Sequence, residues 1–205
     1  QPYRDISIMV NLTIDGKKIK AGTGQTLLQA AREHGIYIPS LCACDALEPY
    51  GSCRVCVVEI TSGKTSSLES ACTYPVAEGL QVATASDEVV KARKLVLDLL
   101  LARCPNVSEV RELAAQYGIS APAEYLTVEN EYCILCGLCV RACSEVVQAD
   151  AISFAGSGKD KSSGQWSVGS GQWSEVSGKW AVGSVERGAW STEDSGQWTG
   201  DRGQG

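Results

Sequence analysis

Histidine is almost absent from this sequence. Its 205 residues include only His34, so the chain lacks the ligands for a zinc site with two histidines or for a centre built from several. Lysine and arginine gather in no patch, and 18 basic against 24 acidic residues give a formal net charge of −6. This charge pattern argues against nucleic-acid binding.

Long apolar runs are missing as well. The longest, residues 95–102, is shorter than the ~18 residues of a membrane helix and contains Asp98. Residues 1–11 are rich in polar residues, which alternate with apolar ones, and this is not the pattern of a secretory signal. We therefore expect a cytoplasmic protein without a membrane span.

Cysteine, in contrast, is abundant. An even number of cysteines permits a disulfide framework, but residues 133–143 crowd four thiols together, which suits several thiolates on one metal centre better. The absence of an export signal also argues against disulfides. The ten cysteines are Cys42, Cys44, Cys53, Cys56, Cys72, Cys104, Cys133, Cys136, Cys139 and Cys143.

The N-terminal part begins with a predicted hairpin. Residues 6–14 alternate between apolar and polar side chains, which is the period of a half-buried strand. Asp15 and Gly16 predict a tight turn, and residues 17–20 the return strand.

A helix and further strands follow the hairpin. Thr26 and Gln29 form a capping-box pattern, and Gly35 predicts the end of the helix. Residues 55–60 and 80–84 predict strands. The fold class expected is therefore α+β, with a sheet that wraps one helix. The apolar face of this helix comprises Leu27, Leu28, Ala30 and Ala31.

The next part of the chain is predicted to be helical. Ser86 is expected to cap a helix that runs to about Arg103, because acidic residues follow it directly. Apolar residues at helical spacing predict a second, shorter helix over residues 110–117. A brief strand is expected at residues 125–128.

Four of the cysteines can form a first metal site. The pattern is C-x10-C-x2-C-x15-C, and soft thiolates are the ligands that iron–sulfur clusters require. Gly51 permits a tight backbone, so the loop can fold around a cluster and point its amides at the sulfurs. A four-cysteine zinc site uses similar ligands and stays open as an alternative. The four residues are Cys42, Cys53, Cys56 and Cys72.

Three stretches around these cysteines resemble a known domain: PSLC at residues 39–42, GSCRVCVVE at 51–59 and ACTYPV at 71–76. Residues 6–85 are similar to the N-terminal [2Fe–2S] domain of the large iron–sulfur subunit of respiratory complex I, iron hydrogenases, NAD-linked formate dehydrogenases and the diaphorase small subunit of NAD-reducing hydrogenases. The resemblance implies a β-grasp fold, with Cys42, Cys53, Cys56 and Cys72 as [2Fe–2S] ligands and Cys44 as a spare thiol.

The second cysteine group matches the bacterial C-x2-C-x2-C-x3-C run for a [4Fe–4S] cluster. Its residues are Cys133, Cys136, Cys139 and Cys143. In two-cluster ferredoxins the fourth cysteine of a run serves the other cluster, yet no cysteine follows Cys143 here. Cys143 itself, Cys44 or Cys104 could supply the fourth ligand.

Residues 156–205 differ from the rest in composition. They hold 12 Gly, 10 Ser and all five Trp, and the fragments GQWS at 164–167 and 171–174 recur. Gly/Ser richness predicts an irregular tail. The resembling family continues into a second cysteine run at this point, so we expect the complete protein to carry one, and a second [4Fe–4S] cluster, in place of this tail.

The linker departs from the family too. Complex I and iron hydrogenases carry a cluster with one His and three Cys ligands there, whereas residues 86–125 contain only Cys104 and no histidine. That cluster cannot be built, and Cys104 is expected to be a helix-terminal thiol.

We therefore expect four parts: a β-grasp [2Fe–2S] domain at 1–85, a helical linker at 86–124, a ferredoxin-like [4Fe–4S] segment at 125–155 and the tail at 156–205. No catalytic constellation or dinucleotide-binding GxGxxG motif is present. This organisation predicts an electron-transfer subunit. The resemblance implies as partners a flavoprotein that oxidises or reduces NAD(P) and a hydrogenase or formate dehydrogenase subunit. Two alternatives stay open: a zinc-binding or redox-inert docking module, and the N-terminal part of a larger oxidoreductase.

Overall fold

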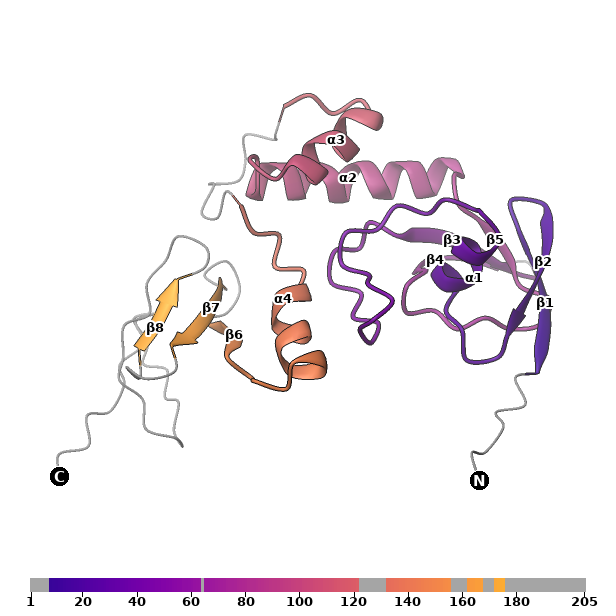
Figure 1. The fold of residues 1–205 in the computed structure, drawn as a ribbon. Coiled ribbons are helices and arrows are strands. Elements are labelled where there is room, and N and C mark those ends of the chain that lie inside the picture. Colours follow the sequence, from indigo (N-terminus) through magenta and orange to yellow (C-terminus); the bar gives the residue numbers. More distant parts are fainter. Residues whose placement is uncertain (1–7, 64, 122–131, 156–161, 168–171, 176–205) are drawn as a thin grey trace, which may run out of the picture.

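The N-terminal sheet, a helical region and a second small sheet follow one another along the chain (Figure 1). The computed structural model describes residues 8–63, 65–121, 132–155, 162–167 and 172–175. The strand expected at residues 125–128 lies outside this part of the chain.

The first sheet has five strands in the order β2-β1-β5-β3-β4. β1 (Met9–Ile14) and β2 (Lys17–Gly22) form the expected antiparallel hairpin around Asp15 and Gly16. β1 also pairs with β5 (Gln81–Ala83) in parallel, which makes the sheet mixed. The predicted alternation places Val10, Leu12 and Ile14 in the core.

Helix α1 (Leu27–Glu33) has the expected capping box. The Thr26 hydroxyl accepts a hydrogen bond from the Gln29 amide at 3.3 Å, and the Gln29 side chain accepts one from the Thr26 amide at 2.8 Å. The predicted apolar face is buried and packs into the same core as strands β1, β2, β3 and β5. The expected α+β arrangement is thus confirmed.

One strand boundary and one additional strand differ from the prediction. β3 (Val57–Ser62) begins after Cys56, because Val55 and Cys56 belong to the cysteine loop. β4 (Thr65–Ser70) was not expected, because its sequence TSSLES has no apolar alternation. It lies at the edge of the sheet, pairs only with β3 among the described strands, and is largely exposed, so it needs no apolar face.

The linker helices form as expected. α2 (Asp87–Arg103) is capped by the Ser86 hydroxyl, which accepts a hydrogen bond from the Val89 amide at 3.4 Å. α3 (Ser108–Gln116) packs against α2. The part of the chain that the structure describes contains no helix of the length and hydropathy needed to span a membrane.

The four-cysteine segment contains the short helix α4 (Leu138–Arg141) and the π-helical turn η1 (Ala142–Val146). Strand β6 (Ile152–Ala155) follows, and a second sheet forms in the order β6-β7-β8. The prediction of an irregular tail is wrong for β7 (Ser162–Ser167) and β8 (Gln172–Glu175). The two recurring GQWS fragments pair with each other as antiparallel strands, with Trp166 opposite Trp173.

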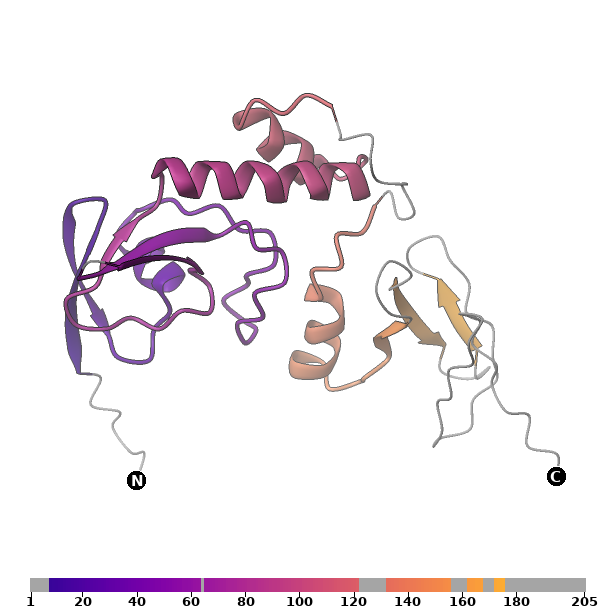
Figure 2. The same cartoon turned by 180° about the vertical axis from the view of Figure 1, so that it is seen from behind.

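Both ribbon views show how these parts meet. α2 extends from the first sheet to the region above α4, and the loop before β3 reaches toward α4 (Figures 1 and 2). A second apolar core joins the regions: Cys42, Cys53 and Val55 of the loop are buried with Leu97 and Leu101 of α2. The fold therefore brings the cysteine loop and the four-cysteine segment together.

Candidate iron–sulfur sites

The first cysteine group lies at the edge of the first sheet, next to the second core. Cys42 and Cys53 belong to the loop between α1 and β3, and Cys56 ends that loop. Cys72 follows β4. All four cysteines are buried, and none of them forms a disulfide.

The four thiols contact one another. Cys42 is hydrogen-bonded by the thiols of Cys53 and Cys72, which lowers the pKa of Cys42 to about 2. The thiol of Cys72 also hydrogen-bonds Cys56 and lowers its pKa to about 7. The same bonds raise the pKa values of the donors, Cys53 and Cys72. The predicted ligand set is therefore gathered in one place.

Backbone amides of the loop point at these sulfurs. The Cys53 amide donates to the Cys42 sulfur at 3.4 Å, and the Ser52 amide also donates to it. The Val55 amide lowers the pKa of Cys53 in the same way. Gly51 makes this possible: its φ is +70°, and a Cβ there would lie 3.1 Å from the Thr73 side chain. The expected role of Gly51 is borne out by this geometry.

This donor set fits a binuclear cluster. Four thiolates with amide donors around them are what a [2Fe–2S] cluster requires, and their four protons leave when metal binds. Among the described residues, no group of three or more Cys, His, Asp or Glu side chains is arranged to hold a single metal ion. Two irons span a wider site than one ion, so their four ligands need not surround one point.

The second cysteine group is more open. Cys133 and Cys136 are half-buried, Cys139 is exposed and Cys143 is buried. Burial raises the pKa of Cys136, and the charges of Cys133, Cys139 and Cys42 raise it further. The sulfur of Cys143 accepts a hydrogen bond from the Ala151 amide at 3.1 Å.

Gly137 shapes the backbone between these cysteines. Its φ is +75°, and a Cβ there would lie 3.3 Å from the Tyr50 ring and 3.4 Å from Phe154. The chain of the second group can thus approach the first loop closely. Leu135 also has a positive φ, of 53°, and its carbonyl accepts a hydrogen bond from the Ser52 hydroxyl at 3.1 Å.

Further contacts join the two groups. Ile134 and Cys136 pack against the core that contains Cys42 and Cys53. The Glu145 carboxylate accepts a hydrogen bond from the Glu48 amide at 3.0 Å. The two cysteine groups, far apart in the sequence, are neighbours in the fold.

The remaining cysteines have different surroundings. Cys44 is exposed. Cys104 forms the C-cap of α2, as expected for a helix-terminal thiol, and it is buried. Its thiol donates to the Cys133 carbonyl at 3.0 Å, and burial raises its pKa to about 11. It stays protonated at neutral pH and ties α2 to the second group.

Two buried arginines were missed by the sequence analysis. Arg93 occupies the buried stripe of α2 with Val89 and Leu97, so a charged residue at an apolar helical position was a usable signal. Arg141 lies between Cys139 and Cys143, and its contacts are made by tertiary structure alone.

Comparisons with known proteins identify the domain that contains the first cysteine group. Residues 7–87 match the family of the 2Fe-2S iron-sulfur cluster binding domain. A chain of the crystal structure of an NAD+-reducing [NiFe]-hydrogenase in the H2-reduced state superposes with a TM-score of 0.66 at 30% identity, over 76% of this chain and 74% of that chain. Residues 7–87 belong to the family of 2Fe-2S iron-sulfur cluster binding domains. The expected resemblance and the [2Fe–2S] cluster are confirmed.

Curated relatives of this iron–sulfur protein extend the comparison. The chain is 34% identical over 174 residues to NADPH-Fe(3+) oxidoreductase subunit alpha of Geobacter sulfurreducens, covering 74% of this chain and 20% of the relative. It is 30% identical over 154 residues to NAD-reducing hydrogenase HoxS subunit gamma of Cupriavidus necator, covering 64% of each. The chain thus spans about a fifth of the Geobacter relative's length.

Proposed function

We propose that this iron–sulfur protein is an electron-transfer subunit. It relays single electrons through a [2Fe–2S] cluster in a β-grasp domain and a [4Fe–4S] cluster in a ferredoxin-like segment. The ligands proposed for the first are Cys42, Cys53, Cys56 and Cys72. Those for the second are Cys133, Cys136 and Cys139, with Cys143 as the fourth candidate.

The observation that carries this proposal is the proximity of the two thiol groups. The charge of Cys42 acts on Cys136, and both residues contact one apolar core. Electron tunnelling falls steeply with distance, so neighbouring centres suit a relay. The clusters supply the one-electron chemistry when bound, and the protein fixes their separation and surroundings.

The chain's own residues favour such centres. Loop amides donate to sulfurs of the first group, and such hydrogen bonds stabilise the more negative, reduced state. The core around Cys42 and Cys53 excludes water, which also changes the potential. The more exposed Cys139 leaves the second group open toward the surface.

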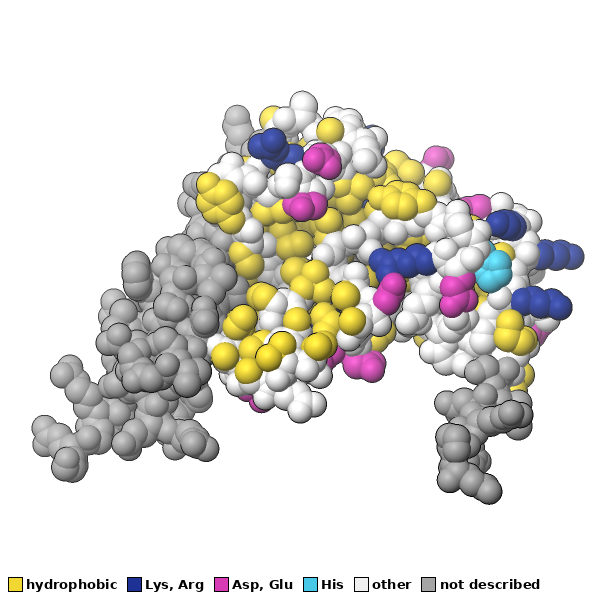
Figure 3. Space-filling model, viewed as in Figure 1, with side chains coloured by type: hydrophobic (Ala, Val, Ile, Leu, Met, Phe, Trp, Pro, Cys, Tyr) yellow, Lys and Arg dark blue, Asp and Glu magenta, His cyan; other side chains and the backbone are white. Residues whose placement is uncertain are grey.

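The proposed partners are a flavoprotein that oxidises or reduces NAD(P) and a catalytic subunit of the hydrogenase or formate dehydrogenase type. The relatives named above support this choice through their NAD(P)-linked names. Figure 3 shows hydrophobic side chains gathered over the middle of one face. Contiguous apolar surface of this kind favours a protein contact. Exposed large hydrophobic residues from α2 onward are Leu95, Leu99, Tyr132, Val146 and Val147.

Metal analysis and electron paramagnetic resonance (EPR) test the proposal. The anaerobically purified chain is expected to hold about six irons, two in the first cluster and four in the second. After reduction, two EPR signals with different temperature dependence are expected. Colourless protein that contains zinc would reject the relay in favour of a structural metal module. About two irons and a single signal would reject the second cluster alone.

A further inference from the structure

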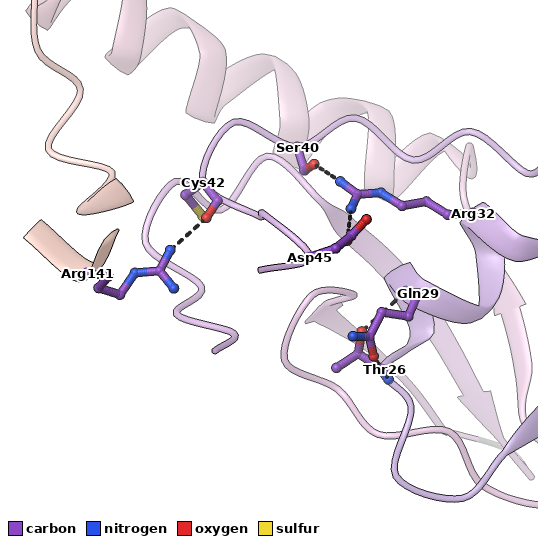
Figure 4. Close-up of polar contacts among 7 residues, drawn as sticks. All are labelled: Thr26, Gln29, Arg32, Ser40, Cys42, Asp45 and Arg141. Atoms are coloured by element: carbon purple, nitrogen blue, oxygen red, sulfur yellow. Dashed lines mark hydrogen bonds and ion pairs between the residues drawn. The ribbon is translucent and has the colours of Figure 1, made fainter. Parts of the chain in front are cut away.

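Arg141 connects the second cysteine segment to the ligand loop of the first. It lies on α4, its residue is only 8% exposed, and it points toward Cys42 (Figure 4). Its Nη2 donates to the Cys42 carbonyl at 3.0 Å, and its Nη1 donates to the Glu48 carbonyl. The guanidinium carbon also lies 5.1 Å from the centroid of the Tyr50 ring.

Among the described residues, Arg141 forms no ion pair with a carboxylate. The ion pairs of Arg32 with Asp45 and of Lys91 with Glu88 do not involve it. The acceptors of Arg141 are neutral carbonyls, and its buried Nε has no hydrogen-bond partner among the described residues. A buried cation without a counter-charge is costly, so negative charge is expected nearby.

The family's [2Fe–2S] cluster is a negative charge of this kind. Four thiolates outweigh the charge of the iron–sulfide unit, and reduction adds one further electron. The carbonyl that Arg141 binds belongs to Cys42, one of the four thiols. Arg141 therefore lies where the cluster's charge would act on it through a buried, low-dielectric contact.

We propose that Arg141 is the charge-compensating and positioning residue of the [2Fe–2S] centre. It reaches that centre from the other cysteine segment. Its charge stabilises the reduced cluster and raises the reduction potential, and its hydrogen bonds hold the Cys42 loop in place. The inference rests on the [2Fe–2S] ligands of the proposed function and does not require the second cluster.

Potentials of matched variants test this proposal. EPR-monitored redox titration of the full chain is carried out with Arg141→Gln, Arg141→Lys and the control Arg32→Gln. Arg32 contacts the same loop through Ser40 and Asp45, but its charge already has a carboxylate partner.

In Arg141→Gln, the ratio of reduced to oxidised [2Fe–2S] cluster at a fixed solution potential is expected to fall about tenfold, which is about 59 mV for one electron. Arg141→Lys keeps the charge but loses the planar fork that binds two carbonyls, so its ratio is expected to fall by no more than about threefold. Arg32→Gln is expected to do the same. An unchanged ratio in Arg141→Gln, or equal falls in Arg141→Gln and either of the other variants, would overturn the proposal.

A second variant keeps the test decisive if Arg141→Gln does not retain its cluster. Glu145→Gln removes an exposed negative charge that binds the Glu48 amide, on the same loop segment as the Arg141 contact. It is expected to raise the ratio about threefold, and no change there would overturn the charge mechanism. Absence of a [2Fe–2S] signal in the parent protein would instead refute the proposed function.

Discussion

The guanidinium of Arg93 donates to the carbonyl of Val55 at 3.0 Å, and Val55 lies in the turn between Cys53 and Cys56. The same side chain donates to the carbonyl of Val57 at 2.6 Å. A buried arginine of α2 thus fastens the cysteine loop from the side of the linker.

Replacing Arg93 is expected to destabilise the protein strongly. Arg93→Met leaves the carbonyls of Val55, Val57 and Thr84 without this donor, and each unsatisfied buried group costs about 1–3 kcal/mol. We expect the free energy of unfolding to fall by about 3 kcal/mol or more in denaturant titrations. The neighbouring exposed Lys94 is the control. Lys94→Met should change the free energy of unfolding by less than about 0.5 kcal/mol. Similar losses in both variants would contradict this role.

Cys53→Ser is expected to remove the [2Fe–2S] cluster selectively. A serine hydroxyl is a poorer ligand for iron than a thiolate, and Cys53 lies in the first thiol group only. EPR spectra of the reduced variant should lose the [2Fe–2S] signal and keep the [4Fe–4S] signal. The control Cys44→Ser changes an exposed thiol and should keep both. Loss of either cluster in Cys44→Ser would show that the ligand assignment is wrong.

Cys136→Ser is expected to have the opposite effect. Cys136 lies within electrostatic reach of Cys133 and Cys139, so its loss should remove the [4Fe–4S] signal and about four of the six irons. Cys104→Ser is a matched control, because Cys104 also contacts the second group but donates through its thiol to a carbonyl. Retention of all iron in Cys136→Ser would contradict the second site.

Gly137→Ala is expected to weaken the junction between the two cysteine groups. An alanine at φ +75° is strained by about 1 kcal/mol, and its Cβ would also press on the Tyr50 ring and Phe154. Gly118→Ala separates the two effects, because Gly118 has φ +76° and no atom within 4 Å of the added Cβ. We expect Gly137→Ala to lose more unfolding free energy than Gly118→Ala. Loss of iron is expected in Gly137→Ala only. Equal behaviour of the two variants would show that the close approach at Gly137 is unimportant.

Local patterns predicted much of the fold. The hairpin at Asp15 and Gly16, the capping box of α1 and the start of α2 at Ser86 each depend on a few adjacent residues. Edge strand β4 was missed because it buries little, and pairing with β3 rather than apolar alternation specifies it. The pairing of β7 with β8 was missed because Gly/Ser composition hides a repeat that can pair with itself.

The sequence by itself determined which chemistry this protein is suited to, because thiolate number and spacing are local properties of the chain. It identified both cysteine groups and their order. Only the tertiary structure decided that the groups are neighbours, and that Arg141 and Arg93 lie buried against the cysteine loop. Such contacts depend on how α2 and α4 pack on the loop, which no spacing along the chain encodes.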